Sequence, residues 1–335
     1  MDTRTLGRTG RTVSVIGLGT WQLGADWGDV SEADAVAVLA ASVEAGVTFF
    51  DTADVYGDGR SEQIIGHFLH GHAGSIAPGV EITVATKMGR RVDQIPENYV
   101  LENFRAWTER SRRNLDTQTL DLVQLHCPPT VVVESGEVYD ALDTLVDEGV
   151  IANYGLSVET CDQALAAIAR PGTATVQIIL NAFRQKPLDE VLSAASAAGV
   201  GIIARVPLAS GLLTGKYTRQ TTFAENDHRN FNRDGSHFDV GETFSGVDYE
   251  TGLSAAAEFS ALVAREDPEL TPAQAALAWV AQLDGVSSVI PGARSTSQAE
   301  ANAAAGSVPR LSAAFNEGVR ELYDRVLRAD IHPRW

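Results

Sequence analysis

The stretch VTFFDTADVYGDGRSE, residues 47–62, combines the features that decide the fold of this chain. Its first part, 47–52, is a short apolar run with β-branched and aromatic residues, which is typical of a buried β-strand. A polar loop with two glycines follows, and a helical pattern occupies residues near 61–70. Asp51 stands where the strand should end, and Tyr56 lies just beyond it. The stretch is therefore predicted to be one strand–loop–helix unit with ionisable groups after its strand.

The same unit recurs along the chain. Helical patterns at 31–46, 61–70, 98–114 and 137–148, among others, alternate with apolar runs expected to be strands at 15–20, 47–52, 81–87, 120–126, 153–158, 174–180, 200–206 and 286–290. Strands of a parallel sheet that is covered on both faces are apolar throughout. Eight such units predict an α/β fold, a (β/α)8 TIM barrel. A doubly wound open sheet competes, but GLGTWQLG after the first strand contains only G-x-G and lacks the dinucleotide fingerprint G-x-G-x-x-G.

Three further segments extend this minimal barrel. An N-terminal β-hairpin is predicted from TRTLG and RTVSVI around a turn at residues 8–10. After the seventh strand, residues 208–250 form a long polar loop, which in a compact domain is usually a lid or a binding loop. One more helical pattern occupies residues 312–328. Since no linker interrupts the pattern, a single domain over residues 1–335 is expected.

The amino-acid composition limits the classes of molecule that the chain is expected to bind. The chain has 335 residues, of which 44% are hydrophobic, and its 44 acidic against 26 basic residues give a net charge of -18. Such an acidic chain is not expected to bind nucleic acid or an anionic membrane surface. Two cysteines form no disulfide framework, and neither a signal peptide nor a run of about 20 apolar residues is present. A cytoplasmic protein is expected, and its oligomeric state does not follow from the sequence.

Four ionisable residues fall at the carboxyl ends of three neighbouring strands. Asp51 ends the second, Lys87 the third and His126 the fourth, and Tyr56 follows the second on its loop. In a TIM barrel these strand ends share one rim, where active sites lie. A phenol has a pKa of about 10, and a nearby ammonium favours its ionised form. The set therefore predicts carbonyl reduction, with Tyr56 as proton donor, Lys87 tuning its pKa, Asp51 holding Lys87 charged and His126 binding the substrate oxygen.

These four residues resemble the Asp-Tyr-Lys-His tetrad of the aldo-keto reductase superfamily. The motifs FFDTADVYGDGRSE, ATKMG, LVQLHCPP, GLSV, PLASGLLTGKY and VIPGARS follow in that family's order over nearly the whole chain. The branch that they resemble most comprises bacterial oxidoreductases related to potassium-channel β-subunit-like proteins. The resemblance implies NADP(H), rather than NAD(H), as the cofactor that supplies the hydride.

The resemblance also implies which residues hold that cofactor. Ser157 and Gln177 would bind the nicotinamide carboxamide, residues 207–216 the pyrophosphate, and Arg294 with its neighbours the adenosine 2′-phosphate, with the loop 208–250 as a cover. The full set of implied cofactor contacts is Gly19, Thr20, Trp21, Asp51, Ser157, Gln177, Arg205, Pro207, Leu208, Ser210, Gly211, Leu213, Lys216, Gly292, Ala293, Arg294, Gln298 and Asn302.

The chain departs from the family pattern at three of these places. Val158 replaces an asparagine after the carboxamide serine, and Ala301 replaces an acidic residue near the adenine. Arg205 stands where a tyrosine or tryptophan often stacks on the nicotinamide. A guanidinium plane can also stack on a ring. Its positive charge would, however, change the relative affinity of the protein for the oxidised and the reduced cofactor. The choice of NADP(H) rests on Arg294.

Contacts with the substrate, a small carbonyl compound or sugar, are expected from an aromatic-walled pocket at the same rim. The expected residues are Trp21, Trp27, Tyr56, Met88 and His126. No metal site is expected, because the histidines at 67, 70 and 72 lack the cysteine or carboxylate partners of a zinc site. Two alternatives to a reductase stay open. One is a regulatory or sensor subunit that binds NADP(H) with little turnover, and the other is a sugar or polyol dehydrogenase working in the oxidative direction.

Overall fold

The predicted (β/α)8 barrel is confirmed in the computed structural model of the protein, which describes residues 1–24, 30–71, 76 and 79–335. One parallel sheet runs in chain order from β3 to β10, and bridges from Ile16 to Val289 and from Gly19 to Gly292 close it into a ring. Its strands are β3 (Leu18–Gly19), β4 (Phe49–Asp51), β5 (Thr83–Met88), β6 (Leu122–His126), β7 (Tyr154–Ser157), β8 (Thr173–Ile179), β9 (Gly201–Arg205) and β10 (Val286–Val289).

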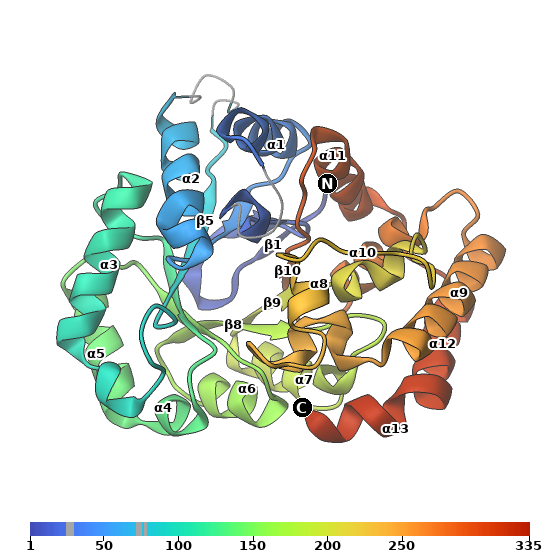
Figure 1. Cartoon of the computed structure of the whole chain (residues 1–335). Helices are drawn as coiled ribbons and strands as arrows, with labels where there is room; N and C mark the ends of the chain where they lie inside the picture. The colour runs from blue at the N-terminus through green and yellow to red at the C-terminus, as the bar shows by residue number, and fades with distance from the viewer. Residues whose placement is uncertain (25–29, 72–75, 77–78) are drawn as a thin grey trace.

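Helices surround this ring (Figure 1). Several begin at the capping residues that the sequence supplies: the Ser31 hydroxyl accepts a bond from the Asp34 amide, and Thr160 and Thr271 form capping boxes. The helices of the strand–helix units are α1 (Glu32–Glu44), α2 (Arg60–Gly71), α3 (Leu101–Leu115), α5 (Gly136–Asp147), α6 (Cys161–Ile168), α7 (Val191–Ala198), α10 (Pro272–Ala281) and α11 (Thr296–Ala304), with the short α4 (Thr130–Glu134) before α5.

Side chains along each strand point alternately into the barrel interior and toward the surrounding helices. A separate interior cluster is formed by fully or nearly fully buried apolar residues: Leu6, Val13, Phe49, Ala85, Leu122, Ile203 and Ile290. The remaining apolar residues form the larger core between the strands and the helices. Buried polar side chains, among them Asp51, Lys87 and Gln177, occupy the interior toward the carboxyl ends of the strands, where the site lies.

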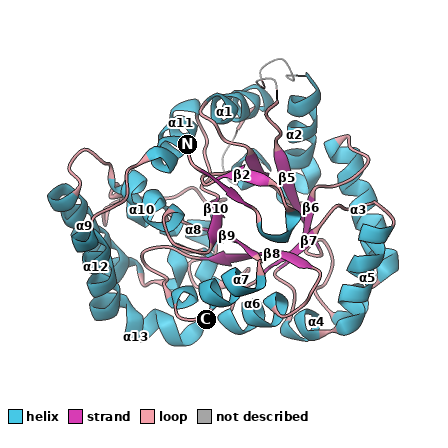
Figure 2. Cartoon of the chain, turned by 180° about the vertical axis from the view of Figure 1, so that it is seen from behind, coloured by secondary structure: helices cyan, strands magenta, loops and turns pink. Residues whose placement is uncertain are grey.

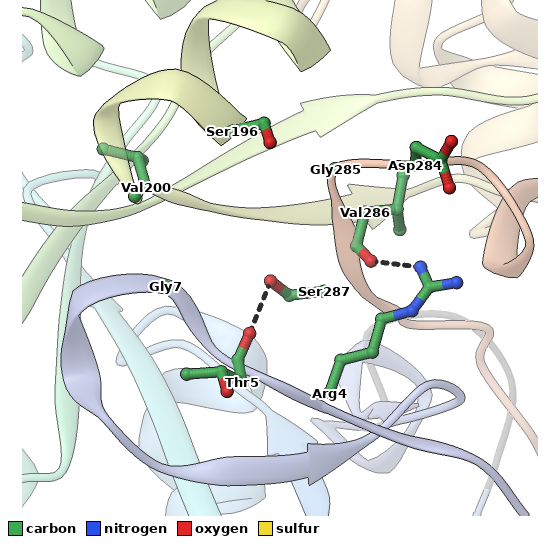
Figure 3. A pocket seen from close by; sticks show the side chains of 10 residues that line it. Arg4, Thr5, Gly7, Ser196, Val200, Asp284, Gly285, Val286 and Ser287 are labelled. Atoms are coloured by element: carbon green, nitrogen blue, oxygen red, sulfur yellow. Dashed lines mark hydrogen bonds between the residues drawn. The ribbon is translucent and has the colours of Figure 1, made fainter.

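The predicted N-terminal hairpin, β1 (Thr3–Thr5) paired antiparallel with β2 (Thr12–Ser14), covers the opposite end of the barrel. Figure 2 shows β2 inside the ring of helices. Arg4 donates to the carbonyl oxygens of Leu283 and Val286, and the Ser287 hydroxyl donates to Thr5, beside a cleft of about 380 Å³ (Figure 3). The cleft lies at the amino-terminal end of the strands, opposite the rim where active sites of this fold lie.

The long polar loop after β9 contains several short elements of regular structure. It contains 3₁₀ turns at Ala209–Thr214, Val240–Glu242 and Phe244–Gly246 and the short helix α8 (His228–Phe231), before α9 (Tyr249–Glu266) begins. Asp227 and Asp239 cap two of these turns through their side chains, which is a local signal that the polar composition obscured. The loop is therefore built from short hydrogen-bonded turns.

The chain ends in the expected additional helix, although it is interrupted. α12 (Ala313–Leu322) passes into a π-helical turn at Tyr323–Leu327 and then into α13 (Arg328–Ile331). Trp335 then packs against the loop after β9, under the guanidinium of Arg184 at 4.0 Å. In the part of the chain that the structure describes, no helix combines the length and the apolar character needed to cross a bilayer.

Candidate active site

A buried ion pair lies at the centre of the carboxyl-terminal rim. Lys87 on β5 donates to the Asp51 carboxylate at the end of β4 and, at 2.9 Å, to the carbonyl oxygen of Thr52. The other carboxylate oxygen accepts bonds from Gln124 at 3.0 Å and Gln177 at 2.8 Å. Each of these residues is at most 2% exposed. The three donors fix the carboxylate in place, so that the ammonium and the carboxylate compensate each other away from water.

The charge on Lys87 follows from this arrangement. Burial opposes the charge, but the attraction of Asp51 and the nearby Tyr56 oxygen raise the pKa of Lys87 above its ordinary value. The lysine is therefore an ammonium at neutral pH. Gln124, which sequence reasoning missed, could have been found from strand alternation, because it lies two residues before His126 and faces the same interior.

Tyr56 begins a 3₁₀ turn, Tyr56–Gly59, directly after β4. The Lys87 nitrogen lies 5.2 Å from the centre of its ring. Burial raises the pKa of Tyr56, and the lowering by Lys87 does not offset it, since Asp51 and Glu242 add to the rise. Lys87 thus acts on the pKa of Tyr56 in the expected direction, although burial and the two carboxylates outweigh it and the net pKa is raised. Tyr56 carries its proton at neutral pH.

His126 ends β6 with 5% of its surface exposed. Its ring stands edge-on to that of Tyr56, with 6.0 Å between the ring centres. Burial and then the cations Arg90, Lys87 and Arg205 lower the pKa of His126 well below its ordinary value. A neutral imidazole has one N–H donor and one acceptor, so His126 can donate one hydrogen bond without carrying charge.

An aromatic wall flanks Tyr56. The ring of Trp21, in a 3₁₀ turn at Trp21–Gly24, is stacked on Tyr56 at 6.0 Å between centres. On its other sides lie His228 at 5.2 Å and Phe238 at 6.0 Å. His228 and Phe238 belong to the loop after β9, which therefore reaches the rim beside Tyr56. Sequence reasoning missed both, because nothing local indicates where a long loop folds back.

Four charged side chains form a closed ring beside His126, which we call the charge ring: Arg90, Glu242, Arg205 and Glu159. Arg90 donates to Glu242 through two nitrogens at 3.2 Å, and Arg205 donates to Glu159 at 2.9 Å. The other two contacts of the ring are Arg205–Glu242 at 3.7 Å and Arg90–Glu159 at 3.5 Å. Sequence reasoning missed Arg90, Glu159 and Glu242. It also treated Arg205 as an uncompensated charge, whereas Glu159 and Glu242 compensate it in the structure.

The residues expected at the nicotinamide end lie together at the rim. Ser157 ends β7, with its hydroxyl 3.4 Å from the sulfur of Cys127. Gln177 also faces the interior, and its amide nitrogen serves Asp51. The Thr20 hydroxyl donates to the Asp51 carbonyl oxygen at 2.9 Å, and Gly19 precedes it at the end of β3. Gln177 and Thr20 thus also hold Asp51 in place.

The segment expected to bind pyrophosphate has an unusual backbone. Ala209, Ser210 and Gly211 all have positive φ, at 48°, 53° and 101°. The amides of Ala209 and Gly211 donate to the carbonyl oxygens of Val206 at 3.0 Å and Leu208 at 2.9 Å, so the run forms a tight hydrogen-bonded turn. The Ser210 hydroxyl donates to the Glu242 carbonyl oxygen at 3.0 Å, which joins this segment to the charge ring. Pro207 and Leu213 are buried, Leu208 is half-buried, and Lys216 is exposed.

The residues expected around the adenosine form the turn into α11. Gln298 accepts from the Arg294 amide at 2.8 Å, and Asn302 donates to the Gly292 carbonyl oxygen at 3.1 Å, with buried Ala293 between them. The Arg294 guanidinium lies 4.0 Å from Asp227 in the loop after β9. Both amide side chains thus shape the turn, and Arg294 is the group that extends from it.

Met88 and Trp27 are two of the expected substrate contacts. Met88 is 1% exposed and belongs to the core between strands and helices. It follows Lys87 on β5 and therefore faces away from the barrel interior, so its assignment to the substrate pocket is wrong. Trp27 lies outside the described residues. Cys127, beside His126, is buried, which raises the pKa of its thiol to about 12 and leaves it unreactive.

The comparisons with known proteins agree with this geometry. The model of the aldo/keto reductase family matches residues 15–324. A probable voltage-gated potassium channel subunit beta of Oryza sativa subsp. japonica is 31% identical over 316 residues, covering 89% of each chain. The structure of the glycerol dehydrogenase AKR11B4 of Gluconobacter oxydans matches with 28% identity and a TM-score of 0.76, over 100% of this chain and 98% of the other. An aldo/keto reductase of Klebsiella pneumoniae in complex with NADPH has the same fold, with 24% identity and a TM-score of 0.69 over 96% of each chain.

Proposed function

The chain belongs to the aldo/keto reductase family, and we propose that it is an NADP(H)-dependent oxidoreductase that reduces an aldehyde or a ketone to an alcohol. The resemblance of its motifs to that family, and to potassium-channel β-subunit-like proteins, is confirmed by the family match and by the rice relative. The observation that carries the proposal is the buried Asp51–Lys87 pair beside a protonated Tyr56 and a neutral His126.

The chain offers groups that fit NADP(H), which supplies a hydride when bound. Residues 207–216 would hold the pyrophosphate, with the exposed Lys216 as a nearby positive charge. Arg294, just before the start of α11, suits a further phosphate, because a helix N-terminus and a guanidinium both favour an anion. That additional phosphate distinguishes NADP(H) from NAD(H). The NADPH in the Klebsiella pneumoniae structure of the same fold supports the same choice.

The catalytic roles follow from charge and burial. Tyr56 gives its proton to the carbonyl oxygen of the substrate as negative charge develops there. The Lys87 ammonium favours the phenolate that results, and Asp51 keeps that ammonium charged. His126 donates its single N–H to the same oxygen. Trp21 provides an apolar wall next to Tyr56, and so a surface for the carbon skeleton of the substrate.

The test is cofactor-linked turnover of the whole chain on a panel of small carbonyl compounds. Aldehydes, ketones and sugars are offered with NADPH or NADH, and alcohols and polyols with NADP⁺. We expect NADPH-linked reduction with NADH a poorer donor. Binding of NADPH, measured separately by fluorescence, without turnover in either direction would contradict the proposal.

Two relatives favour specific alternatives. The rice protein's name, a potassium channel subunit, favours a sensor that binds NADP(H) with little turnover. The Gluconobacter oxydans protein, a glycerol dehydrogenase, favours polyol oxidation. Tight NADPH binding without turnover would support the first, and a higher kcat/KM with a polyol and NADP⁺ than with any carbonyl compound and NADPH would support the second.

A further inference from the structure

The charge ring is the largest feature of the site that the proposed chemistry leaves unused. Its members come from four separate parts of the chain: Arg90 after β5, Glu159 after β7, Arg205 at the end of β9 and Glu242 in the loop after β9. Their signs alternate around the ring, and each side chain contacts both neighbours of opposite sign. Four loops and strand ends thus converge to place two positive and two negative charges together.

All four groups are largely removed from water, with 9–21% of each side chain exposed. The two arginines hold the pKa of Glu242 down to about 2 although burial opposes this, and the carboxylates raise the pKa of both arginines. Glu159 pairs with both guanidiniums. The ring therefore carries two full charges of each sign at neutral pH, and its net charge is zero.

The ring adjoins the point where hydride transfer is proposed. A nitrogen of Arg90 lies 3.5 Å from Nε2 of His126, and a nitrogen of Arg205 lies 3.7 Å from the sulfur of the next residue, Cys127. A hydride donor must lie against the carbonyl carbon whose oxygen Tyr56 and His126 hold. Such a donor therefore lies beside the ring. Its nicotinamide is neutral when reduced and positively charged when oxidised, so only the oxidised form responds to the net charge nearby.

We propose that the charge ring sets the ratio of the affinities for NADP⁺ and NADPH, with Glu159 and Glu242 balancing the charge that Arg90 and Arg205 place beside the nicotinamide. This inference rests on the proposed function. An isolated Arg205 would repel the oxidised cofactor. With both carboxylates present, this repulsion is cancelled. Neither NADP⁺ nor NADPH is then bound so much more tightly that its slow release disfavours one direction of the reaction.

The proposal fixes the sign of each variant's effect. Glu242→Gln leaves the ring with one excess positive charge, so binding of NADP⁺ weakens relative to NADPH. Arg205→Met leaves one excess negative charge, and the ratio moves the other way. A unit charge about 10 Å away, at an effective dielectric constant of about 20, changes such a ratio by roughly tenfold. The double variant has zero net charge again, and its ratio returns toward that of the wild type.

The experiment measures the dissociation constants of NADPH and NADP⁺ by tryptophan fluorescence and by calorimetry. The proteins are the wild type, Glu242→Gln, Arg205→Met, the double variant, and Glu258→Gln as a matched control. Glu258 is a half-exposed carboxylate on α9 that also pairs with an arginine, Arg325, but on the outer surface. The control should leave the ratio unchanged.

Opposite shifts in the two single variants, with restoration in the double variant, would support the proposal. A purely structural role would weaken both cofactor forms together and leave the ratio unchanged, and that result would overturn it, as would shifts of equal sign. If Glu242→Gln does not fold, Glu159→Gln removes the same charge and gives the same test. Failure of the wild type to bind either form would instead remove the proposed function itself.

Discussion

The buried ion pair at the base of the site makes a sharp prediction about Asp51→Asn. In this variant the Lys87 nitrogen keeps the carbonyl oxygen of Thr52 but loses its carboxylate, in a place where the lysine is 1% exposed. The asparagine also turns an NH₂ group toward a cluster of donors that includes Gln124 and Gln177. Breaking a buried pair on one side costs about 3–5 kcal/mol of unfolding free energy.

The assay is urea denaturation at neutral pH combined with NADPH-linked turnover. The pKa of Lys87 is raised in the folded state, so its stabilising contribution is complete below the unfolded value of about 10.4 and disappears only above it. A neutral assay therefore measures the whole effect. Turnover should fall by about 100-fold or more, because without the Asp51 carboxylate burial disfavours the charge on Lys87, and that charge favours the Tyr56 phenolate.

The matched control is the double variant Asp51→Asn/Lys87→Met. Replacing both members of a buried pair is often close to neutral for stability, so we expect the double variant to recover most of the lost free energy while staying inactive. Equal stability of Asp51→Asn and the wild type would refute the reasoning. The reasoning would also be refuted if the double variant lost as much unfolding free energy as Asp51→Asn and Lys87→Met lose separately, taken together. The two side chains would then not be coupled.

Three other predictions concern residues around the site. Burial raises the pKa of Asp54 to about 7, so the folded state binds the proton of Asp54 more tightly than the unfolded chain does. The free energy of unfolding should therefore fall by up to about 4 kcal/mol as the pH rises from about 4 to 7. Urea denaturation at pH 4 and at pH 7 should show a smaller difference for Asp54→Asn, and an unchanged difference would contradict this. Trp335→Ala should cost about 3–5 kcal/mol, because the ring packs under Arg184 and bonds Asp239, whereas Trp335→Phe should lose clearly less; equal losses in thermal unfolding would contradict this. Met88→Leu should leave the KM for the carbonyl substrate within about twofold, since volume-conserving core changes are tolerated, and a larger change in steady-state kinetics would return Met88 to the pocket.

The fold and the central residues of the site follow from the sequence because both depend on short-range patterns. The apolar runs set the strands, and residues that end neighbouring parallel strands must meet at one rim. Asp51, Lys87 and His126 all end such runs. Strand alternation, applied strictly, would also have found Gln124 and excluded Met88, since it decides which side chains face the interior.

The rest of the site depends on loops, whose paths the sequence does not specify. Arg90, Glu159 and Glu242 look like ordinary solvent-exposed charges in the sequence, and only the three-dimensional structure shows that they meet Arg205. The net direction in which the pKa of Tyr56 shifts was also beyond sequence reasoning, because it depends on burial and on Glu242, which the loop after β9 supplies. The path of this loop therefore contributes both to the charge ring and to the pKa of Tyr56.

The central claim is that Tyr56 is the proton donor for carbonyl reduction. The most direct test compares NADPH oxidation by Tyr56→Phe and the wild type on a carbonyl substrate, with NADPH binding measured on the same preparations. The account predicts that turnover falls by about 100-fold or more, while the dissociation constant of NADPH changes little. Unchanged turnover in Tyr56→Phe would contradict it.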